Sequence, residues 1–251
     1  MTAAVSIRGL VKTYGPKAAV AGIDLDVPAG SFFGLVGPNG AGKTTTLLMC
    51  AGLLRPDSGR IELLGRDVWR DPRSAKEYVG VLPEGMLFFE RLTGTELLTY
   101  TGLLRRMDRG IVDRRAAELL EVFGLADAAG KLVVDYSTGM LKKVGLAAAL
   151  LHAPRLLFLD EPFEGVDPVS AHTIRSVLDG YTSSGGTIVF SSHVMELVER
   201  LCDTVAVMVD GQIAAAGPVD EVRGAATLEE TFVDIVGGSE IAPESLAWLR
   251  S

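Results

Sequence analysis

Cysteine is rare in this sequence, and long runs of uncharged hydrophobic residues are missing. The two cysteines, Cys50 and Cys202, lie far apart without CxxC spacing, which favours small buried side chains in a reducing compartment over a disulfide or a metal site. The densest apolar stretch, 144–151, is far shorter than the roughly 20 residues that span a bilayer. The N-terminal residues show no apolar segment with a signal cleavage site. We therefore expect a cytoplasmic chain that reaches a membrane only through a partner chain.

Positive charge is also scarce. The 24 Lys and Arg residues stand against 32 Asp and Glu residues, which gives a net charge of −8. Because binding to a phosphate backbone depends on clustered positive charge, nucleic acid is not expected as a partner. Of the 251 residues, 48% are hydrophobic and 22% are charged, which excludes disordered, collagen-like and disulfide-rich classes. The length suits one large domain, or a core with an inserted subdomain.

The hydrophobic pattern changes between strand and helix along the chain. Short apolar or alternating runs predict strands at 23–27, 32–36, 78–82, 156–159 and 187–190. Helical spacing predicts helices at 43–54, 168–181 and 228–236, and a helical block at 93–151 that begins with a capping box. A hairpin is expected around Asp210 and Gly211, because valines alternate before this turn. This order of elements is typical of an α/β fold with a helical insertion.

Residues 37–44, Gly-Pro-Asn-Gly-Ala-Gly-Lys-Thr, match the pattern GxxxxGK[ST]. The segment follows the strand that ends at Val36 and precedes an apolar-periodic helix, as a phosphate-binding loop must. Backbone N–H groups of such a loop and the positive end of the helix can surround phosphate oxygens. Lys43 can reach the β- and γ-phosphates, and the Thr44 hydroxyl can ligate Mg²⁺. We interpret the segment as a nucleotide site rather than an ordinary glycine-rich turn.

Further polar residues follow two predicted strands. Asp160 and Glu161 end the apolar strand 156–159, at the sheet edge where α/β proteins bind ligands. There Asp160 can hold Mg²⁺ and Glu161 can orient the attacking water, although two acids are also common as a plain polar strand end. His193 follows the next strand at the same edge, where it can contact the γ-phosphate or act as a structural hydrogen-bonding group. Tyr14, before a Gly-Pro turn, can stack on a base or pack in the first sheet.

Together these motifs resemble the nucleotide-binding subunit of an ABC transporter, and the match covers nearly the whole chain. The resemblance implies ATP and Mg²⁺ as cofactors, with adenine stacked on Tyr14. It also implies that Asp160 and Glu161 are the Walker B acid and the catalytic glutamate, and that His193 is the switch histidine. The implied Walker A motif consists of Gly37, Pro38, Asn39, Gly40, Ala41, Gly42, Lys43, Thr44 and Thr45.

The segment 136–140, Tyr-Ser-Thr-Gly-Met, stands where the family has its signature LSGGQ. The resemblance implies that this helix N-terminus, with Ser137 and Gly139, binds the γ-phosphate held by the opposite subunit of a head-to-tail dimer. It further implies that Asp167 is the D-loop acid. Of the signature, only Ser137 and Gly139 are kept, which predicts weaker binding of the opposite phosphate.

Two other departures from the family pattern add carboxylates. Glu84 stands where the family has the Q-loop glutamine, so we expect it near Mg²⁺ together with Thr44 and Asp160. Glu164 replaces a small or neutral residue of the D-loop. The Pro-Glu Q-loop, the Glu-Pro-Phe sequence at 161–163 and a short C-terminal helix are similar to the ABC-2 class of exporters, whose ATPase is a separate polypeptide.

The expected fold is α/β, with a P-loop NTPase core, an N-terminal antiparallel β subdomain and an inserted α-helical subdomain at about 85–152. We expect the ATPase domain to cover 1–236 and a tail to cover 237–251. The predicted function is ATP hydrolysis that powers transport, with export implied by the resemblance. The expected partners are transmembrane permease subunits on a separate chain and a second ATPase subunit, identical or paired, that docks head to tail on ATP binding. These partners would hold the chain at the inner face of the cell membrane.

Two alternatives are weighed against this prediction. A non-transport ABC protein that acts as a nucleotide-gated clamp on a macromolecule usually has paired ATPase domains, a long coiled coil or basic extensions, none of which the sequence shows. A P-loop GTPase would need an Asn-Lys-x-Asp base-reading segment, which is missing, and would leave the segment 136–140 unexplained.

Overall fold

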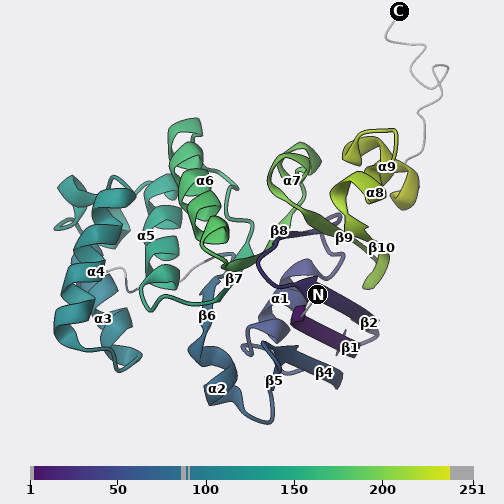
Figure 1. The fold of residues 1–251 in the computed structure, drawn as a ribbon, viewed down its shortest axis with the longest axis horizontal. Coiled ribbons are helices and arrows are strands. Elements are labelled where there is room, and N and C mark those ends of the chain that lie inside the picture. Colours follow the sequence, from purple (N-terminus) through teal and green to yellow (C-terminus); the bar gives the residue numbers. More distant parts are fainter. Residues whose placement is uncertain (1–2, 86–88, 90, 238–251) are drawn as a thin grey trace, which may run out of the picture.

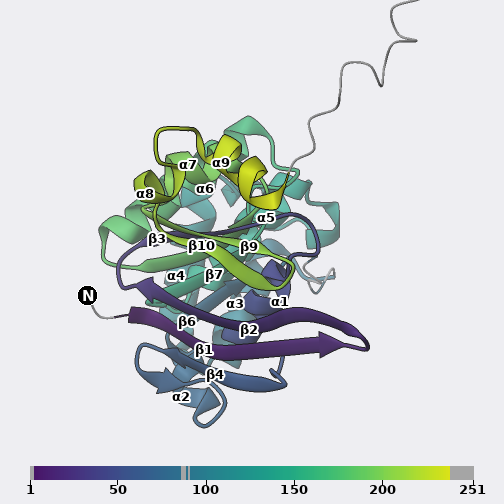
Figure 2. The same ribbon diagram turned by 90° about the vertical axis from the view of Figure 1, so that its right-hand side faces the viewer.

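The computed structural model describes residues 3–85, 89 and 91–237. Its strands are β1 (Ala3–Tyr14), β2 (Lys17–Pro28), β3 (Phe32–Val36), β4 (Ser58–Leu63), β5 (Arg66–Asp67), β6 (Val79–Leu82), β7 (Leu156–Asp160), β8 (Thr187–Ser192), β9 (Thr204–Val209) and β10 (Gln212–Pro218). They form a four-stranded antiparallel sheet in the order β2-β1-β4-β5 and a six-stranded central sheet in the order β10-β9-β3-β8-β7-β6. In the central sheet all neighbours pair in parallel except β10 and β9. Figure 2 shows the antiparallel sheet as a layer beside the central sheet.

Both faces of the central sheet are covered. Strands β3 and β7 are buried along their whole length. Their side chains alternate between two hydrophobic cores, with Phe32 and Leu157 in one and Phe33 and Leu156 in the other. A strand that is covered on both faces reads as a continuous apolar run, which is why the sequence pattern predicts these strands.

The helices lie at the ends of the central sheet and on its faces. They are α1 (Lys43–Cys50), α2 (Pro72–Glu77), α3 (Gly94–Leu104), α4 (Arg109–Val122), α5 (Thr138–Leu150), α6 (Pro168–Ser183), α7 (Met195–Leu201), α8 (Val219–Arg223) and α9 (Leu228–Val236), with short 3-10 turns at Ala126–Ala128 and Val133–Asp135. Figure 1 shows α3, α4 and α5 gathered beyond β6, and α8 and α9 near β10 at the opposite end. Within the part of the chain that the structure describes, no helix combines the length and apolar character needed to cross a bilayer.

The expected fold class is confirmed, and so is the position of each predicted strand. The sequence pattern does not predict β1, because its pairing with β2 shifts register at several points and breaks the strict alternation that marks an exposed strand. The helical insertion lies between β6 and β7, with α3 to α5 inside the expected range 85–152. Of the tail expected at 237–251, all but Gly237 lies outside the described residues.

The helix expected at 43–54 is shorter than predicted. It ends at Cys50, because Gly52 takes a left-handed φ of 66°. The N–H of Gly52 donates to the carbonyl of Met49 at 3.1 Å, and the N–H of Leu53 donates to that of Leu48 at 2.9 Å. These two bonds form a glycine-terminated C-cap, a stop signal that apolar periodicity alone does not reveal.

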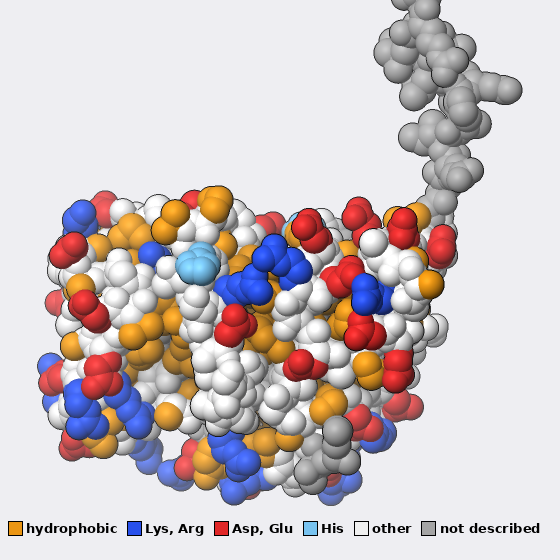
Figure 3. Space-filling model, turned by 45° about the horizontal axis from the view of Figure 1, so that its top comes forward, with side chains coloured by type: hydrophobic (Ala, Val, Ile, Leu, Met, Phe, Trp, Pro, Cys, Tyr) orange, Lys and Arg blue, Asp and Glu red, His pale blue; other side chains and the backbone are white. Residues whose placement is uncertain are grey.

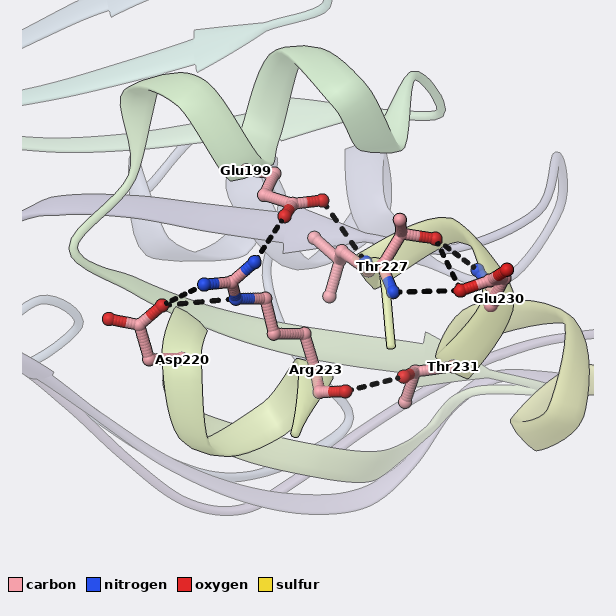
Figure 4. Close-up of polar contacts among 7 residues, drawn as sticks. Glu199, Asp220, Arg223, Thr227, Glu230 and Thr231 are labelled. Atoms are coloured by element: carbon pink, nitrogen blue, oxygen red, sulfur yellow. Dashed lines mark hydrogen bonds and ion pairs between the residues drawn. The ribbon is translucent and has the colours of Figure 1, made fainter. Parts of the chain in front are cut away.

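Glu199 joins the last three helices (Figure 4). Its two carboxylate oxygens accept hydrogen bonds from the Arg223 guanidinium of α8 at 2.9 Å and from the N–H of Leu228, the first residue of α9, at 3.1 Å. Arg223 also pairs with Asp220 at 2.8 Å. Helix α7, which carries Glu199, begins at Met195, so this network fixes the helix that follows the edge of β8.

The surface of α8 and α9 is acidic. Figure 3 shows acidic side chains gathered over this end of the molecule. The exposed acidic residues of the two helices are Asp220, Glu221, Glu229, Glu230 and Asp234. A negative surface of this kind repels other anionic surfaces.

His152 and Arg105 tie the helical insertion to the central sheet. The carbonyl oxygen of Val79 in β6 lies 3.0 Å from Nε2 of His152 and 3.2 Å from the guanidinium of Arg105 at the end of α3. Because a carbonyl can only accept, Nε2 carries the proton, and Nδ1 is buried with no partner among the described residues. Burial, together with the charge of Arg105, lowers the pKa of His152 to about 4.

His152→Gln should flatten the loss of stability in acid. The unfolded chain binds a proton at this histidine near pH 6.5, whereas the folded chain does so only near pH 4, so its contribution is present above 6.5 and is lost as the pH falls to 4. The free energy of unfolding should fall between these limits by up to roughly 3 kcal/mol more in the wild type than in the variant. Urea unfolding across this range measures it, with His172→Gln on α6 as a control, and equal slopes in the wild type and the His152 variant would contradict the assignment.

Candidate functional site

The segment 37–42 forms a tight loop between β3 and α1. Gly42 has a left-handed φ of 109°, and a Cβ there would lie 2.2 Å from the carbonyl oxygen of Ala19. A Cβ at Gly37 would lie 2.2 Å from the carbonyl oxygen of Met208. Glycine is therefore needed at both ends of the loop, because neighbouring backbone approaches it closely. The loop leads directly into the N-terminus of α1, whose first N–H groups lack partners within the helix.

Lys43, the first residue of α1, bends back over this loop. Its Nζ donates to the carbonyl oxygens of Gly37 at 2.7 Å and Pro38 at 3.3 Å. The residue is only 6% exposed. Burial lowers the pKa of Lys43, and the carboxylates of Glu161 and Asp160 oppose this shift. A buried cation at a helix N-terminus suits an anionic ligand such as a phosphate.

Asp160 and Glu161 lie at the carboxyl end of β7, and both are buried. Ser191 of β8 joins them, because its Oγ donates to Oδ1 of Asp160 at 2.5 Å and accepts from the N–H of Glu161 at 3.0 Å. Oδ2 of Asp160 is buried and has no hydrogen-bond partner among the described residues. Since a buried oxygen without a donor is costly, this atom fits a site that a cation completes.

Glu161 and His193 face each other at this edge of the sheet. Nδ1 of His193 lies 3.0 Å from Oε1 of Glu161. Burial raises the pKa of Glu161, while the hydrogen bond from His193 and the charge of Lys43 partly offset this rise. Glu161 also has a left-handed φ of 45°, which is uncommon for a residue with a side chain. The carboxylate is therefore held in one position by its partners rather than by backbone preference.

Lys43, Glu161 and His193 line one cleft with a volume of about 520 Å³. Its walls come from the β1-β2 hairpin, the loop before α1, and the segments that follow β6, β7 and β8. The lining residues are Tyr14, Lys17, Ala19, Asn39, Gly40, Gly42, Lys43, Thr44, Thr45, Glu84, Glu161, Glu164 and His193. Tyr14 is 53% exposed, so its ring is available for stacking. The structure thus brings together most of the residues that the sequence predicts.

Some residues of the cleft are not predicted, and some predicted residues do not line it. Gly37, Pro38, Ala41 and Asp160 support the cleft without lining it. Lys17, Ala19 and Glu164 line it but are missing from the predicted site. The signal that could have found Lys17 is its position three residues after Tyr14, at the turn of the first hairpin. The prediction missed Lys17 because the sequence pattern does not predict β1, the first strand of that hairpin.

Thr44 and Glu84 approach each other across the cleft, with Oγ1 of Thr44 and Oε2 of Glu84 3.4 Å apart. Together with Asp160 they offer the hard oxygen ligands that Mg²⁺ prefers. Within residues 3–85, 89 and 91–237, no group of three or more His, Cys, Asp or Glu side chains could hold a metal ion. The residues therefore fit a Mg²⁺ ion that takes further ligands from a nucleotide, and they do not fit a metal centre built of protein alone.

Ser137, Gly139 and Asp167 do not line the cleft of their own chain. Ser137 caps α5, because its Oγ accepts from the N–H of Met140 at 3.3 Å. Asp167 caps α6 by accepting from the N–H groups of the two residues after Pro168, at 3.0 and 2.9 Å. A Cβ at Gly139 would lie 2.8 Å from Oδ2 of Asp167, so the two helix starts are packed tightly together. Ser137 and Asp167 are exposed at these two helix starts, whereas Gly139 is buried.

Tyr136, which stands where the family signature has leucine, is part of the core. Its hydroxyl donates to the carbonyl oxygen of Ala128 at 2.8 Å, and a Cβ at Gly94 would lie 2.3 Å from that hydroxyl. Burial raises the pKa of Tyr136. This departure from the family signature is therefore matched by packing inside the helical insertion.

A glycine-rich loop before a helix, a buried lysine in the first helical turn and a carboxylate pair on a neighbouring strand define a P-loop nucleotide hydrolase. Comparisons with known proteins narrow this class. A family model described as ABC transporter matches residues 20–164. The chain is 39% identical to the daunorubicin/doxorubicin resistance ATP-binding protein DrrA of Streptomyces peucetius, over 88% of this chain and 67% of that protein. It is 38% identical to the linearmycin resistance ATP-binding protein LnrL of Bacillus subtilis (strain 168), over 84% of this chain and 68% of that protein.

A solved structure titled "Structure of ATP binding subunit of ABC transporter" superposes with a TM-score of 0.86 at 28% identity, and the match covers 93% of this chain and 99% of that one. The chain belongs to the ABC transporter family, as an ATP-binding subunit. It is an ATPase, and its relatives support an ATP-driven exporter subunit. The alternative of a clamp on a macromolecule is not favoured.

Tyr136→Phe should destabilise the fold by about 1 kcal/mol, because the carbonyl of Ala128 loses one of its two donors and keeps only the N–H of Lys131, at 2.9 Å. Turnover of ATP should stay close to that of the wild type, since the hydroxyl faces the core. Urea unfolding and a steady-state ATPase assay measure the two quantities. Tyr100→Phe removes a more exposed hydroxyl from α3 and is the matched control. An unchanged unfolding midpoint in Tyr136→Phe would show that the hydrogen bond does not stabilise the insertion.

Proposed function

We propose that ATP binds in the cleft with its phosphates over the loop 37–44 and its adenine on Tyr14. The observation that carries this proposal is the buried ammonium of Lys43 at a helix start, opposite the carboxylates of Asp160 and Glu161. The loop N–H groups and Lys43 would bind the β- and γ-phosphates, because both supply hydrogen-bond donors. Thr45 lines the same cleft and would bind the phosphates from the first turn of α1.

Thr44 and Asp160 would hold Mg²⁺, with Glu84 beside them. The unpartnered Oδ2 of Asp160 and the approach of Thr44 to Glu84 support this assignment. When bound, Mg²⁺ would neutralise charge on the phosphate oxygens. Ser191 would orient Asp160, because its hydroxyl engages one carboxylate oxygen and leaves the other for the metal.

Glu161 would orient and deprotonate the attacking water. Its burial and raised pKa favour proton uptake, and its 3.0 Å contact with His193 fixes the carboxylate at the cleft. His193 would act as the switch histidine that contacts the γ-phosphate from the same edge, since its side chain is 44% exposed. The histidine thereby has a structural contact and a ligand contact at once.

The helix starts that carry Ser137, Gly139 and Asp167 would meet the nucleotide of a second ATPase subunit, identical or paired, in a head-to-tail dimer. Ser137 and Asp167 are exposed outside the cleft of their own chain, and the N-terminus of α5 can bind an anion, which supports this arrangement. Closure of the dimer on ATP binding would move transmembrane permease subunits on a separate chain, through the groove beside Glu84 and the helical insertion. Those partners would hold the chain at the inner face of the membrane and would carry the cargo site.

The direction proposed is export. DrrA and LnrL are named as resistance proteins, and the bacitracin transport ATP-binding protein BcrA of Enterococcus faecalis is 36% identical over 87% of this chain. Co-purification from detergent-solubilised membranes tests the assembly. A stoichiometric multi-span protein is the expected partner, while ribosomes or DNA in its place would overturn the proposal.

Glu161→Gln should lower turnover by at least about a hundredfold, because the variant keeps the shape of the side chain and loses the base. ATP should still bind, and a closed dimer should accumulate. Steady-state turnover, ATP titration calorimetry and size-exclusion chromatography with ATP and Mg²⁺ measure these effects. Glu196→Gln on α7 removes the same charge from an exposed position and is the control. Turnover at the wild-type rate in Glu161→Gln would remove the glutamate from the mechanism.

Glu84→Gln should keep turnover within about tenfold of the wild type. The amide oxygen of the variant can still approach the metal, and the loss of negative charge, which weakens Mg²⁺ binding, is offset by less repulsion of the γ-phosphate. The Mg²⁺ concentration needed for half-maximal rate should rise, and Glu84→Ala should cost more. A Mg²⁺ titration of the ATPase rate, with and without the membrane partner, compares the three proteins. If both variants keep the wild-type Mg²⁺ requirement, Glu84 points away from the metal and serves the partner instead.

A further inference from the structure

Lys142 connects helix α5 to the residue proposed as catalytic base. Its Nζ donates to the backbone carbonyl oxygen of Glu161 at 2.6 Å. Lys142 lies in the second turn of α5, the helix that Ser137 caps. No motif of the sequence marks this lysine, and its contact joins residues on two elements that meet only in the folded chain.

The backbone of Glu161 is held from two sides. Its N–H donates to Oγ of Ser191 at 3.0 Å, and its carbonyl accepts from Lys142. The only other donor to this carbonyl among the described residues is the N–H of Glu164, at a longer distance of 3.3 Å. Because Glu161 has a left-handed φ of 45°, its conformation depends on such contacts. A change at either contact would let the side chain swing away from His193.

The bond from Lys142 is charge-assisted. Burial lowers the pKa of Lys142, and the surrounding carboxylates oppose this shift by favouring the protonated amine. These carboxylates are Glu164, Asp160, Glu84 and Glu161. Lys142 also lines a second hollow next to the cleft, together with Thr44, Glu84 and Glu164. A donor that carries charge forms a stronger and more directional bond to a carbonyl than a neutral one does.

We propose that Lys142 is a positioning residue for ATP hydrolysis, which fixes the backbone of Glu161 and thereby the direction of its carboxylate. The proposal rests on the role proposed for Glu161. The proposal adds a link within one subunit. The start of α5, with Ser137 and Gly139, would meet the opposite nucleotide. The same helix carries Lys142, which holds the backbone of the catalytic Glu161 in its own cleft. A displacement of α5 would therefore change the position of Glu161 directly.

Lys142→Met tests this link, because it keeps the length and apolar stem of the side chain and removes the donor. With the full-length chain, kcat should fall about 10- to 100-fold while KM for ATP and the calorimetric Kd of ATP change less than about threefold. Lys142→Arg keeps a charged donor and should restore kcat to within about threefold of the wild type. Lys143→Met removes the neighbouring charge on α5, which has no hydrogen bond or ion pair with another described residue, and should leave all three quantities unchanged.

Three results would overturn the proposal. One is a wild-type kcat in Lys142→Met. Another is a loss of ATP affinity as large as the loss of kcat, which would indicate a lysine that serves the ligand or the fold. The third is a folded Lys142→Arg, checked by its thermal unfolding midpoint, that shows no recovery of kcat. Glu161→Gln, measured in parallel, distinguishes failure of the proposed function from failure of this inference. If Glu161→Gln turns over ATP at the wild-type rate, the proposed function is overturned. If Glu161→Gln loses turnover while Lys142→Met keeps it, only the role of Lys142 is overturned.

Discussion

Three charged side chains are buried within one edge of the central sheet. Lys43, Asp160 and Glu161 are each less than 10% exposed, at 6%, 3% and 8%. Charges placed in such surroundings are costly unless they are paired or hydrogen-bonded. Ser191, His193 and the carbonyls of the phosphate loop supply most of these partners. The carboxyl ends of β7 and β8 and the start of α1 bring these groups to the same place.

The remaining unpaired atom explains why this arrangement suits a nucleotide. Oδ2 of Asp160 lacks a partner among the described residues, and Lys43 has only carbonyls. A metal-bound triphosphate would supply a cation to the first and anionic oxygens to the second, so binding would complete contacts that the folded chain leaves open. The additional carboxylates of Glu84 and Glu164 at the same cleft make it more acidic than the family pattern implies.

Much of the fold was accessible to local pattern analysis, since strands covered on both faces are continuously apolar and helices begin at recognisable caps. Strand β1 was not predicted because its register shifts break the alternation of apolar and polar residues. Helix α1 ends earlier than predicted because Gly52 forms its C-cap. In the site, the loop residues were predictable because GxxxxGK[ST] is one continuous segment. Lys17 and Lys142 were not, since neither lies within a motif and each reaches the cleft or its edge only in the folded chain.

By itself the sequence determined which chemical groups are available and in which order: a glycine loop that leads into a helix, two acids after an apolar strand, and a histidine after the next one. Family membership follows from that order. Only the tertiary structure decided that Ser191 engages both acids, that Lys142 holds the carbonyl of Glu161, and that Tyr136 bonds to Ala128 inside the helical insertion. The physical reason is that the partner of a buried polar group depends on which elements pack side by side. Which elements pack side by side depends on the burial of both faces of the sheet, and the local spacing of residues along the chain does not determine it.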